Sequence, residues 1–376
     1  MPFLQSLSRV ALLALTVGAV AGCASGLSAT SELVYVGAGI DGGQLRALRL
    51  DTVSGKLSSV GPVAQVAKPR WAVAHAKLPM LYVASDVGAE DGHVLAFAVD
   101  RASGSLKKVS EVAAGGSGTT HLDFDLPSMT LLAANFGGGS TSSIAVHADG
   151  KLDTLVSTIK STGSGPNRRQ AGPHAHGVAV DPSGRFALVA DLGADRVFVY
   201  ALDRATHALA PAGAFAVPPG SGPHHLAFGL DGRFVYLLNE LSADVTTLRW
   251  DAQSGTLRAV QALPITSEGF QGAKSASELA VSPDGSCVYV SDRGENSLLV
   301  YRVNAETGEL SLMQRIAAGG ELPWSFAIDA AGRWLLVANQ RSNSLNLFSI
   351  DAASGRLTDT GQAIEVPAPL SVTFMN

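Results

Sequence analysis

The chain has 376 residues, of which 41 are glycine, and only 16% of its residues are charged. Its formal net charge of −5 excludes the basic face that a nucleic-acid-binding protein needs to neutralise phosphates, so we expect no nucleic-acid partner. Abundant glycine together with a hydrophobic fraction of 46% is typical of many short buried strands joined by tight turns.

The first predicted element is an export signal. Arg9 precedes an apolar run over residues 10–21, a pattern that is typical of a secretory signal and too short to span a bilayer. We therefore predict that residues 1–22 are a signal peptide and that the protein is exported to a bacterial periplasm.

Two processing sites compete at the end of this signal. Cleavage after Ala19-Val20-Ala21 would release a soluble protein, whereas Val20-Ala21-Gly22-Cys23 resembles a bacterial lipobox in which Cys23 carries a lipid. We favour the lipobox, because it explains a cysteine at this position in a chain that has only one other. Residues 23–32 are then a flexible tether, and the lipid on Cys23 is the only expected membrane contact.

From residue 33 onward the sequence repeats itself. A strand-like run with a small turn, as in residues 281–292, is followed by a second apolar run and an acid–x–x–Ser/Thr–Gly–x–Leu turn, as in residues 251–257. A period of roughly 40–50 residues is typical of four-stranded propeller blades. We count seven units and predict an all-β, seven-bladed β-propeller over residues 33–376.

The two ends of this repeat indicate how the ring closes. The first unit begins directly on a second-strand pattern at Leu33, and residues 369–374 form a strand pattern without a unit of their own. We predict that the C-terminal strand pairs into the first blade, because an open ring would leave unpaired strand edges.

Ionisable side chains collect on one rim of the predicted ring. Strands one and two of a blade are antiparallel neighbours, so the start of the first and the end of the second share a rim. The first strands supply Arg70, Trp71, His121, His174, His176, His224, His225, Glu278 and Trp324, and the second strands supply Asp86, Asn135, Asp191, Asn239, Glu240, Asp292, Arg293, Asn339 and Gln340. Such convergence is typical of an active site.

Several of these groups also have a structural interpretation. Asp86, Asn135 and Asp292 fit equally well as turn residues that bond their own backbone. The basic pair Arg168-Arg169 lies in a predicted loop and is expected on a solvated face, although its nearness to the histidine pair leaves a role with a substrate anion open.

Four segments carry a resemblance to a known family: residues 172–200, 222–241, 277–294 and 327–340. They resemble the seven-bladed propeller lactonases, which include propeller-type 6-phosphogluconolactonases and are related to carboxymuconate-lactonizing enzymes. The resemblance extends over residues 33–374. It implies a lactone hydrolase that opens a small sugar lactone with base-activated water and needs neither a cofactor nor a metal.

The resemblance also implies roles for particular residues. The catalytic groups would be His176, Glu240 and Arg293, with Glu240 or His176 as the base and Arg293 as the anion holder. The substrate-binding groups would be His174, Asp191, His224, His225, Asn239, Glu278, Asn339 and Gln340. Related enzymes often carry arginine where this chain has His224, and a titratable group in place of a fixed charge weakens the case for a phosphorylated substrate.

Three other functions remain open from the sequence. A metal-dependent lactonase could use oxygen ligands from Asn135, Asp191, Asn239 and Glu240, but we expect no histidine or cysteine cluster of metal-ligand spacing. An exported propeller could instead be a binding module without chemistry, or a cycloisomerase that uses the same histidines and glutamate for proton transfer alone.

Overall fold

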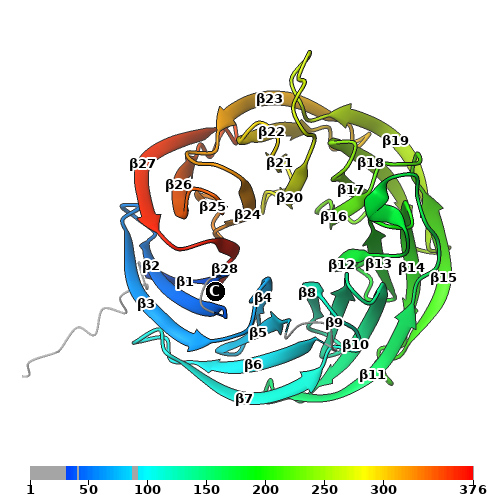
Figure 1. Ribbon diagram of the computed structural model, residues 1–376, viewed down its shortest axis with the longest axis horizontal. Helices are drawn as coiled ribbons and strands as arrows, with labels where there is room; N and C mark the ends of the chain where they lie inside the picture. The colour runs from blue at the N-terminus through cyan, green and yellow to red at the C-terminus, as the bar shows by residue number, and fades with distance from the viewer. Residues whose placement is uncertain (1–30, 40–41, 87–91, 376) are drawn as a thin grey trace, which may run out of the picture.

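The computed structural model describes residues 31–39, 42–86 and 92–375. These residues form seven four-stranded antiparallel sheets that stand like blades around a central axis (Figure 1), which confirms the predicted seven-bladed propeller. The predicted signal peptide, Cys23 and the tether up to residue 30 lie outside the described residues. No helix within the described part of the chain is long and apolar enough to cross a membrane.

Each blade is built from four strands that run in order from the axis to the outside. The first four blades are β28 (Pro369–Met375), β1 (Ser31–Ala38), β2 (Gln44–Asp51), β3 (Leu57–Gln65); β4 (Trp71–Ala74), β5 (Met80–Ser85), β6 (His93–Val99), β7 (Leu106–Ala113); β8 (Thr119–Asp125), β9 (Thr130–Asn135), β10 (Ser140–Val146), β11 (Leu152–Lys160); and β12 (Ala175–Val180), β13 (Phe186–Asp191), β14 (Arg196–Leu202), β15 (Leu209–Ala216).

The last three blades follow the same plan. They are β16 (Pro223–Phe228), β17 (Phe234–Asn239), β18 (Asp244–Asp251), β19 (Thr256–Pro264); β20 (Ala276–Val281), β21 (Cys287–Asp292), β22 (Ser297–Val303), β23 (Leu310–Ala317); and β24 (Pro323–Ile328), β25 (Trp334–Asn339), β26 (Ser344–Ile350), β27 (Leu357–Glu365). A short 3-10 helix, η1 (Arg168–Gln170), precedes the fourth blade.

The C-terminal strand closes the ring as predicted. β28 pairs antiparallel with β1, from Leu33 opposite Met375 to Ala38 opposite Pro369. It also bonds to the second blade, because the Ser371 hydroxyl donates to the Pro69 carbonyl and the Thr373 hydroxyl donates to the Ala72 carbonyl. The two ends of the described chain are thus joined within one sheet, and β1 is paired on both sides, with β28 and with β2.

The hydrophobic core lies between neighbouring blades. One cluster, for example, combines Val34, Leu48 and Phe374 of the first blade with Leu336 and Leu347 of the seventh. Second strands are covered on both faces, which explains why strands such as β17 are continuous apolar runs with every residue buried.

The glycine of the repeated acid–x–x–Ser/Thr–Gly turn serves this packing. Gly104 and Gly355 have φ values of 80° and 74°, and their carbonyls accept hydrogen bonds from Tyr35 and Tyr289 of the preceding blades at 2.9 and 2.8 Å. A Cβ on Gly355 would lie 2.3 Å from the Cys287 sulfur. The turn therefore both reverses the chain and links one blade to the next.

Candidate functional site

A β-bulge recurs at the start of the innermost strand in six of the seven blades. At each bulge the pairing between the innermost and second strands skips one residue, or two in the sixth blade. The skipped residues are Leu370, Thr120, His176, His224, Ser277 with Glu278, and Trp324. A bulge re-aims the side chain of its extra residue, and five of the blades turn such a side chain toward the central pocket.

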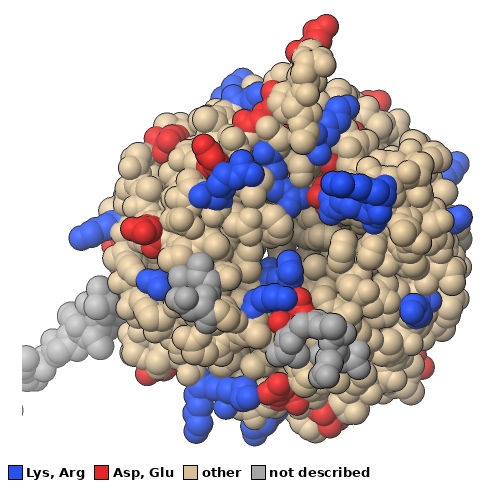
Figure 2. Space-filling view, in the orientation of Figure 1, with Lys and Arg blue, Asp and Glu red and all other residues tan. Residues whose placement is uncertain are grey.

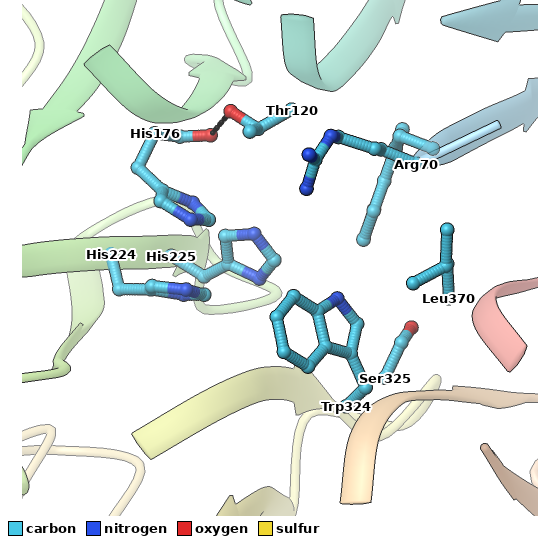
Figure 3. Close-up of a pocket in the computed structure, with 9 residues that line it drawn as sticks. Arg70, Thr120, His176, His224, His225, Trp324, Ser325 and Leu370 are labelled. Atoms are coloured by element: carbon cyan, nitrogen blue, oxygen red, sulfur yellow. Dashed lines mark hydrogen bonds between the residues drawn. The ribbon is translucent and has the colours of Figure 1, made fainter. Parts of the chain in front are cut away.

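Five of the skipped residues line one pocket at the centre of the ring (Figure 3). They are Leu370, Thr120, His176, His224 and Trp324, joined by Arg70, Trp71, His225 and Ser325. The pocket has a volume of about 40 Å³, which accommodates a few water molecules or the reacting end of a ligand. Lysine and arginine side chains gather around the central opening of the face shown in Figure 2.

Glu240 anchors two arginines beside this pocket. It follows β17 and is only 4% exposed. Its Oε1 accepts hydrogen bonds from Arg169 Nη1 at 2.7 Å and Arg293 Nη2 at 2.9 Å, and its Oε2 accepts one from Arg169 Nη2 at 3.2 Å. Both carboxylate oxygens are therefore bound to guanidinium groups, an arrangement that suits an anchor better than a free base.

Arg293 is held on three sides. Its Nη2 also donates to the Ala276 carbonyl at 2.7 Å, and its guanidinium carbon lies 4.7 Å from the centre of the Trp324 ring. Burial lowers the pKa of Arg293, while Glu240 beside it raises that pKa. Neither Arg293 nor Glu240 lines the pocket itself; they support Trp324 and His224, which do.

Two neutral histidines stack at the pocket wall. The ring centres of His176 and His224 are 3.5 Å apart, and His224 Nε2 lies 3.6 Å from Glu240 Oε2. Burial lowers the pKa of both histidines well below its usual value; the positive charge of Arg293 and the neighbouring His225 lower it further. Both imidazoles are therefore uncharged at neutral pH.

His225 is oriented by a carboxylate. Its Nδ1 lies 2.7 Å from Glu278 Oε1, and the Ser325 hydroxyl donates to Glu278 Oε2 at 3.1 Å. The carboxylate fixes the proton on Nδ1, so Nε2 presents its lone pair. His225 Nε2 has no hydrogen-bond partner among the described residues, and the ring lines the pocket.

A stack of three rings lies between the pocket and two larger cavities. The Trp71 and His121 ring centres are 4.1 Å apart, and each ring also contacts His225, at 5.2 and 4.8 Å. Beyond this stack lie two adjoining cavities of about 310 and 350 Å³, lined largely by apolar residues such as Ile328 and Val372. The stack therefore separates a polar pocket from an apolar one.

Six residues expected to bind substrate do not line the pocket, and one of them, Glu278, orients His225 from behind. His174 stacks on Phe136 with ring centres 4.4 Å apart, and Asp191 Oδ1 accepts the backbone N–H groups of His174, Gly193 and Ala194. The amide of Asn239 bonds Asp244 and Thr246, and that of Asn339 bonds Asn346 and the Ala318 carbonyl. Gln340 is tied through its backbone N–H to the Leu322 carbonyl.

These contacts correct the interpretation of the strand ends. Asp191, Asn239 and Asn339 satisfy backbone and side-chain groups of their own blades, which is a structural role. His174 contacts the pocket only indirectly. Its ring packs on Phe136, and Phe136 contacts His176, with ring centres 5.5 Å apart. Burial raises the pKa of Asp191, and three backbone donors hold the carboxylate in its turn.

Several residues that form or support the site have no role that the sequence predicts. Thr120 and Leu370 reach the pocket only because a bulge redirects them, which strand alternation does not reveal. Arg169 is exposed, as predicted, but its guanidinium group binds Glu240, a contact that the sequence does not indicate. Its loop is fixed by η1, where Asn167 caps the helix and the buried Gln170 bonds the Leu192 carbonyl and Asp195, and this turns Arg169 toward Glu240.

Three of the rim histidines lie closer together than the sequence predicts. One ring nitrogen from each of His176, His224 and His225 lies within 4.8 Å of the others. By contrast, the oxygen ligands considered from the sequence, such as Asn135 and Asn239, are engaged within their own blades.

Comparison with known proteins gives a consistent result. Residues 33–374 match the family model described as lactonase, 7-bladed beta-propeller. A 6-phosphogluconolactonase of Bacillus subtilis is 30% identical over 92% of this chain and 99% of its own length, and one from Formosa agariphila is 31% identical over 73% and 79%. A solved structure of a periplasmic gluconolactonase from Pseudomonas aeruginosa superposes with a TM-score of 0.86, at 31% identity over 92% of this chain and 99% of that chain.

Proposed function

This chain belongs to the lactonase family of seven-bladed β-propellers and shares its activity as a lactone hydrolase, and from this premise we propose that it opens a sugar lactone in the central pocket. The assignment of the catalytic base rests on the His225–Glu278 pair, because this pair offers an oriented imidazole lone pair inside the pocket. Arg70 lines the same pocket and its guanidinium group points into it (Figure 3).

We assign the base to His225. Its Nε2 takes a proton from water as the water oxygen attacks the lactone carbonyl carbon, and Glu278 stabilises the imidazolium that forms. The ring carbon–oxygen bond then breaks, the ring oxygen leaves with that proton as a hydroxyl, and the product is a hydroxy acid. A positioned base of this kind contributes about 10²–10⁴-fold in rate.

The oxyanion needs a preorganised donor, and Arg70 is the cationic group that lines the pocket. Such a donor is worth about 3–4 kcal/mol of transition-state stabilisation. Of the three residues expected to be catalytic, His176 contributes a neutral imidazole that orients the water. Glu240 and Arg293 form the charged support behind His224 and Trp324, so Glu240 is a positioning residue.

We propose a neutral sugar lactone as the preferred substrate. His224 is uncharged at the position where related enzymes often carry arginine, so a fixed positive charge for a phosphate is missing there. The similar Pseudomonas aeruginosa protein is named a periplasmic gluconolactonase, which agrees with the export signal. Together these observations support a periplasmic enzyme, anchored through a lipid on Cys23.

The test is a hydrolysis assay of the purified chain on gluconolactone and 6-phosphogluconolactone, with the spontaneous rate subtracted. We expect turnover of gluconolactone with the higher kcat/KM. His225→Asn retains a donor for Glu278 but has no base, and should lower kcat by about 10²–10⁴-fold; the matched control is His147→Asn at an exposed position. A folded His225→Asn protein with wild-type kcat would overturn the base assignment, and no turnover of either lactone would favour a binding module.

A further inference from the structure

We propose that His176, His224 and His225 form a binding site for a divalent transition-metal ion such as Zn²⁺. The three rings meet at one wall of the pocket, with one nitrogen of each within 4.8 Å of the other two. Imidazole nitrogens are the ligands that suit zinc, copper and nickel. Three histidines with an open fourth position facing a pocket are an arrangement that zinc accepts.

Ring nitrogens without a hydrogen-bond partner provide independent support. His176 Nδ1, His224 Nδ1 and His225 Nε2 are all buried and have no hydrogen-bond partner among the described residues. His224 and His225 are only 4% and 6% exposed. A buried nitrogen left without a partner is costly, so each of the three rings has a nitrogen that would gain from binding an ion.

Carboxylates stand behind two of the three rings. Glu278 binds His225 at Nδ1, on the far side of the ring from its free Nε2, and Glu240 Oε2 lies 3.6 Å from His224 Nε2, opposite its free Nδ1. Such outer carboxylates orient metal-binding histidines and make them better ligands. They also offset the charge of Arg169 and Arg293, since the two glutamates and the two arginines sum to zero.

The rings must move closer for the ion to bind. Zinc–nitrogen bonds of about 2.0–2.1 Å place two tetrahedral ligands about 3.4 Å apart, so the most distant pair of nitrogens has to approach by about 1.4 Å. His176 is the ring with room to do so, because it is the one of the three that is only partly buried.

Metal binding has a consequence for the proposed function, on which this step rests. An ion held by His225 Nε2 occupies the lone pair that the water-activating base requires. We therefore expect Zn²⁺ to inhibit lactone hydrolysis, with half-inhibition at the concentration that half-saturates the site.

The binding test uses the untagged chain, stripped with chelator and titrated with Zn²⁺ by calorimetry and with Co²⁺ by its tetrahedral absorption bands. We expect one ion per chain. His224→Gln should abolish the bands, and Glu278→Gln should weaken affinity by about 10–100-fold while it keeps a hydrogen bond to His225. His147→Gln, at an exposed position, is the control that should bind like wild type, and the melting temperature of each variant reports whether it is folded.

The proposal is overturned if wild type binds no ion, or if folded His224→Gln and Glu278→Gln bind as tightly as wild type. Hydrolysis is measured in parallel, so the two proposals fail separately. A protein that binds Zn²⁺ but opens no lactone retains the metal site and loses the proposed function. A protein that opens a lactone but binds no Zn²⁺ retains the proposed function and loses the metal site.

Discussion

Two glutamates on the pocket rim of the propeller and two aspartates on the opposite rim are bound in contrasting ways. On the rim away from the pocket, Asp181 and Asp329 each accept two or more backbone N–H groups from their own hairpin turn. On the pocket rim, Glu240 binds arginines from the loop before the fourth blade and from the sixth blade, and Glu278 binds His225 of the fifth and Ser325 of the seventh.

This difference separates what repeats from what varies. A turn carboxylate is satisfied by neighbours a few residues away, so one sequence motif can recur around the ring. Glu240 and Glu278 are satisfied by other blades, so their roles depend on the closed ring. The local bonds stabilise the scaffold, and the bonds between blades assemble the chemistry.

Removal of β28 should have the largest effect, because it breaks the ring on which every inter-blade contact depends. A chain that ends at residue 366 loses the inner strand of the first blade and the partner of β1. We expect an aggregated protein without a cooperative melting transition in circular dichroism. As a control, the full-length chain with Val53→Ser, at a side chain that is 71% exposed, should melt like wild type. A truncated protein that also melts like wild type would contradict ring closure.

Glu240→Ala should be the most destabilising single change on the pocket rim. It leaves Arg293, which is 8% exposed, as an uncompensated buried charge, and removal of one partner from a buried pair costs about 3–5 kcal/mol. Glu240→Gln keeps the shape and should cost less. Urea denaturation measures both variants, and a loss below about 1 kcal/mol for Glu240→Ala would show that Arg293 does not depend on this carboxylate.

These outcomes bear on how far the sequence predicts the structure. The blade count, the closing strand and the rim positions of Glu240 and Glu278 follow from local patterns of period and turn. The partner of Glu240 does not, because Arg169 lies 71 residues earlier in the chain, in a loop whose path depends on η1 and the buried Gln170. The positions of the bulges cannot be predicted from the sequence either, because strand alternation gives no signal for the residue that the pairing skips.

The histidines should make the protein sensitive to mild acid. The pKa values of His121, His176 and His224 are held well below the usual value, mainly by burial, so the unfolded chain takes up these protons first. Stability should therefore be full above about pH 6.5 and fall as the pH drops below it, by up to about 1.4 kcal/mol per pH unit for each histidine.

Asp292 partly opposes this loss, because burial raises its pKa to about 6, and its protonation in the folded state favours folding as the pH falls further. Denaturation midpoints measured between pH 7.5 and 5 test the slope. His121→Phe, which keeps a ring against Trp71, should reduce the slope by one histidine. An unchanged slope in that variant would assign the acid sensitivity to other groups.

The smallest effect is expected on the opposite rim. Asp351 Oδ1 accepts hydrogen bonds from the backbone and the side chain of Ser354 in an exposed turn, so Asp351→Ala should lower the melting temperature only slightly and leave kcat/KM unchanged. A large loss of activity in this variant would mean that the two rims are coupled.

The most direct test of the central claim is a crystal structure of the protein with gluconolactam, a stable mimic of a sugar lactone. We predict that its carbonyl group enters the pocket between Arg70 and His225 Nε2, with Trp324 against the sugar ring. A ligand found instead in the apolar cavities beyond Trp71, or on the outer surface of a blade, would contradict the account.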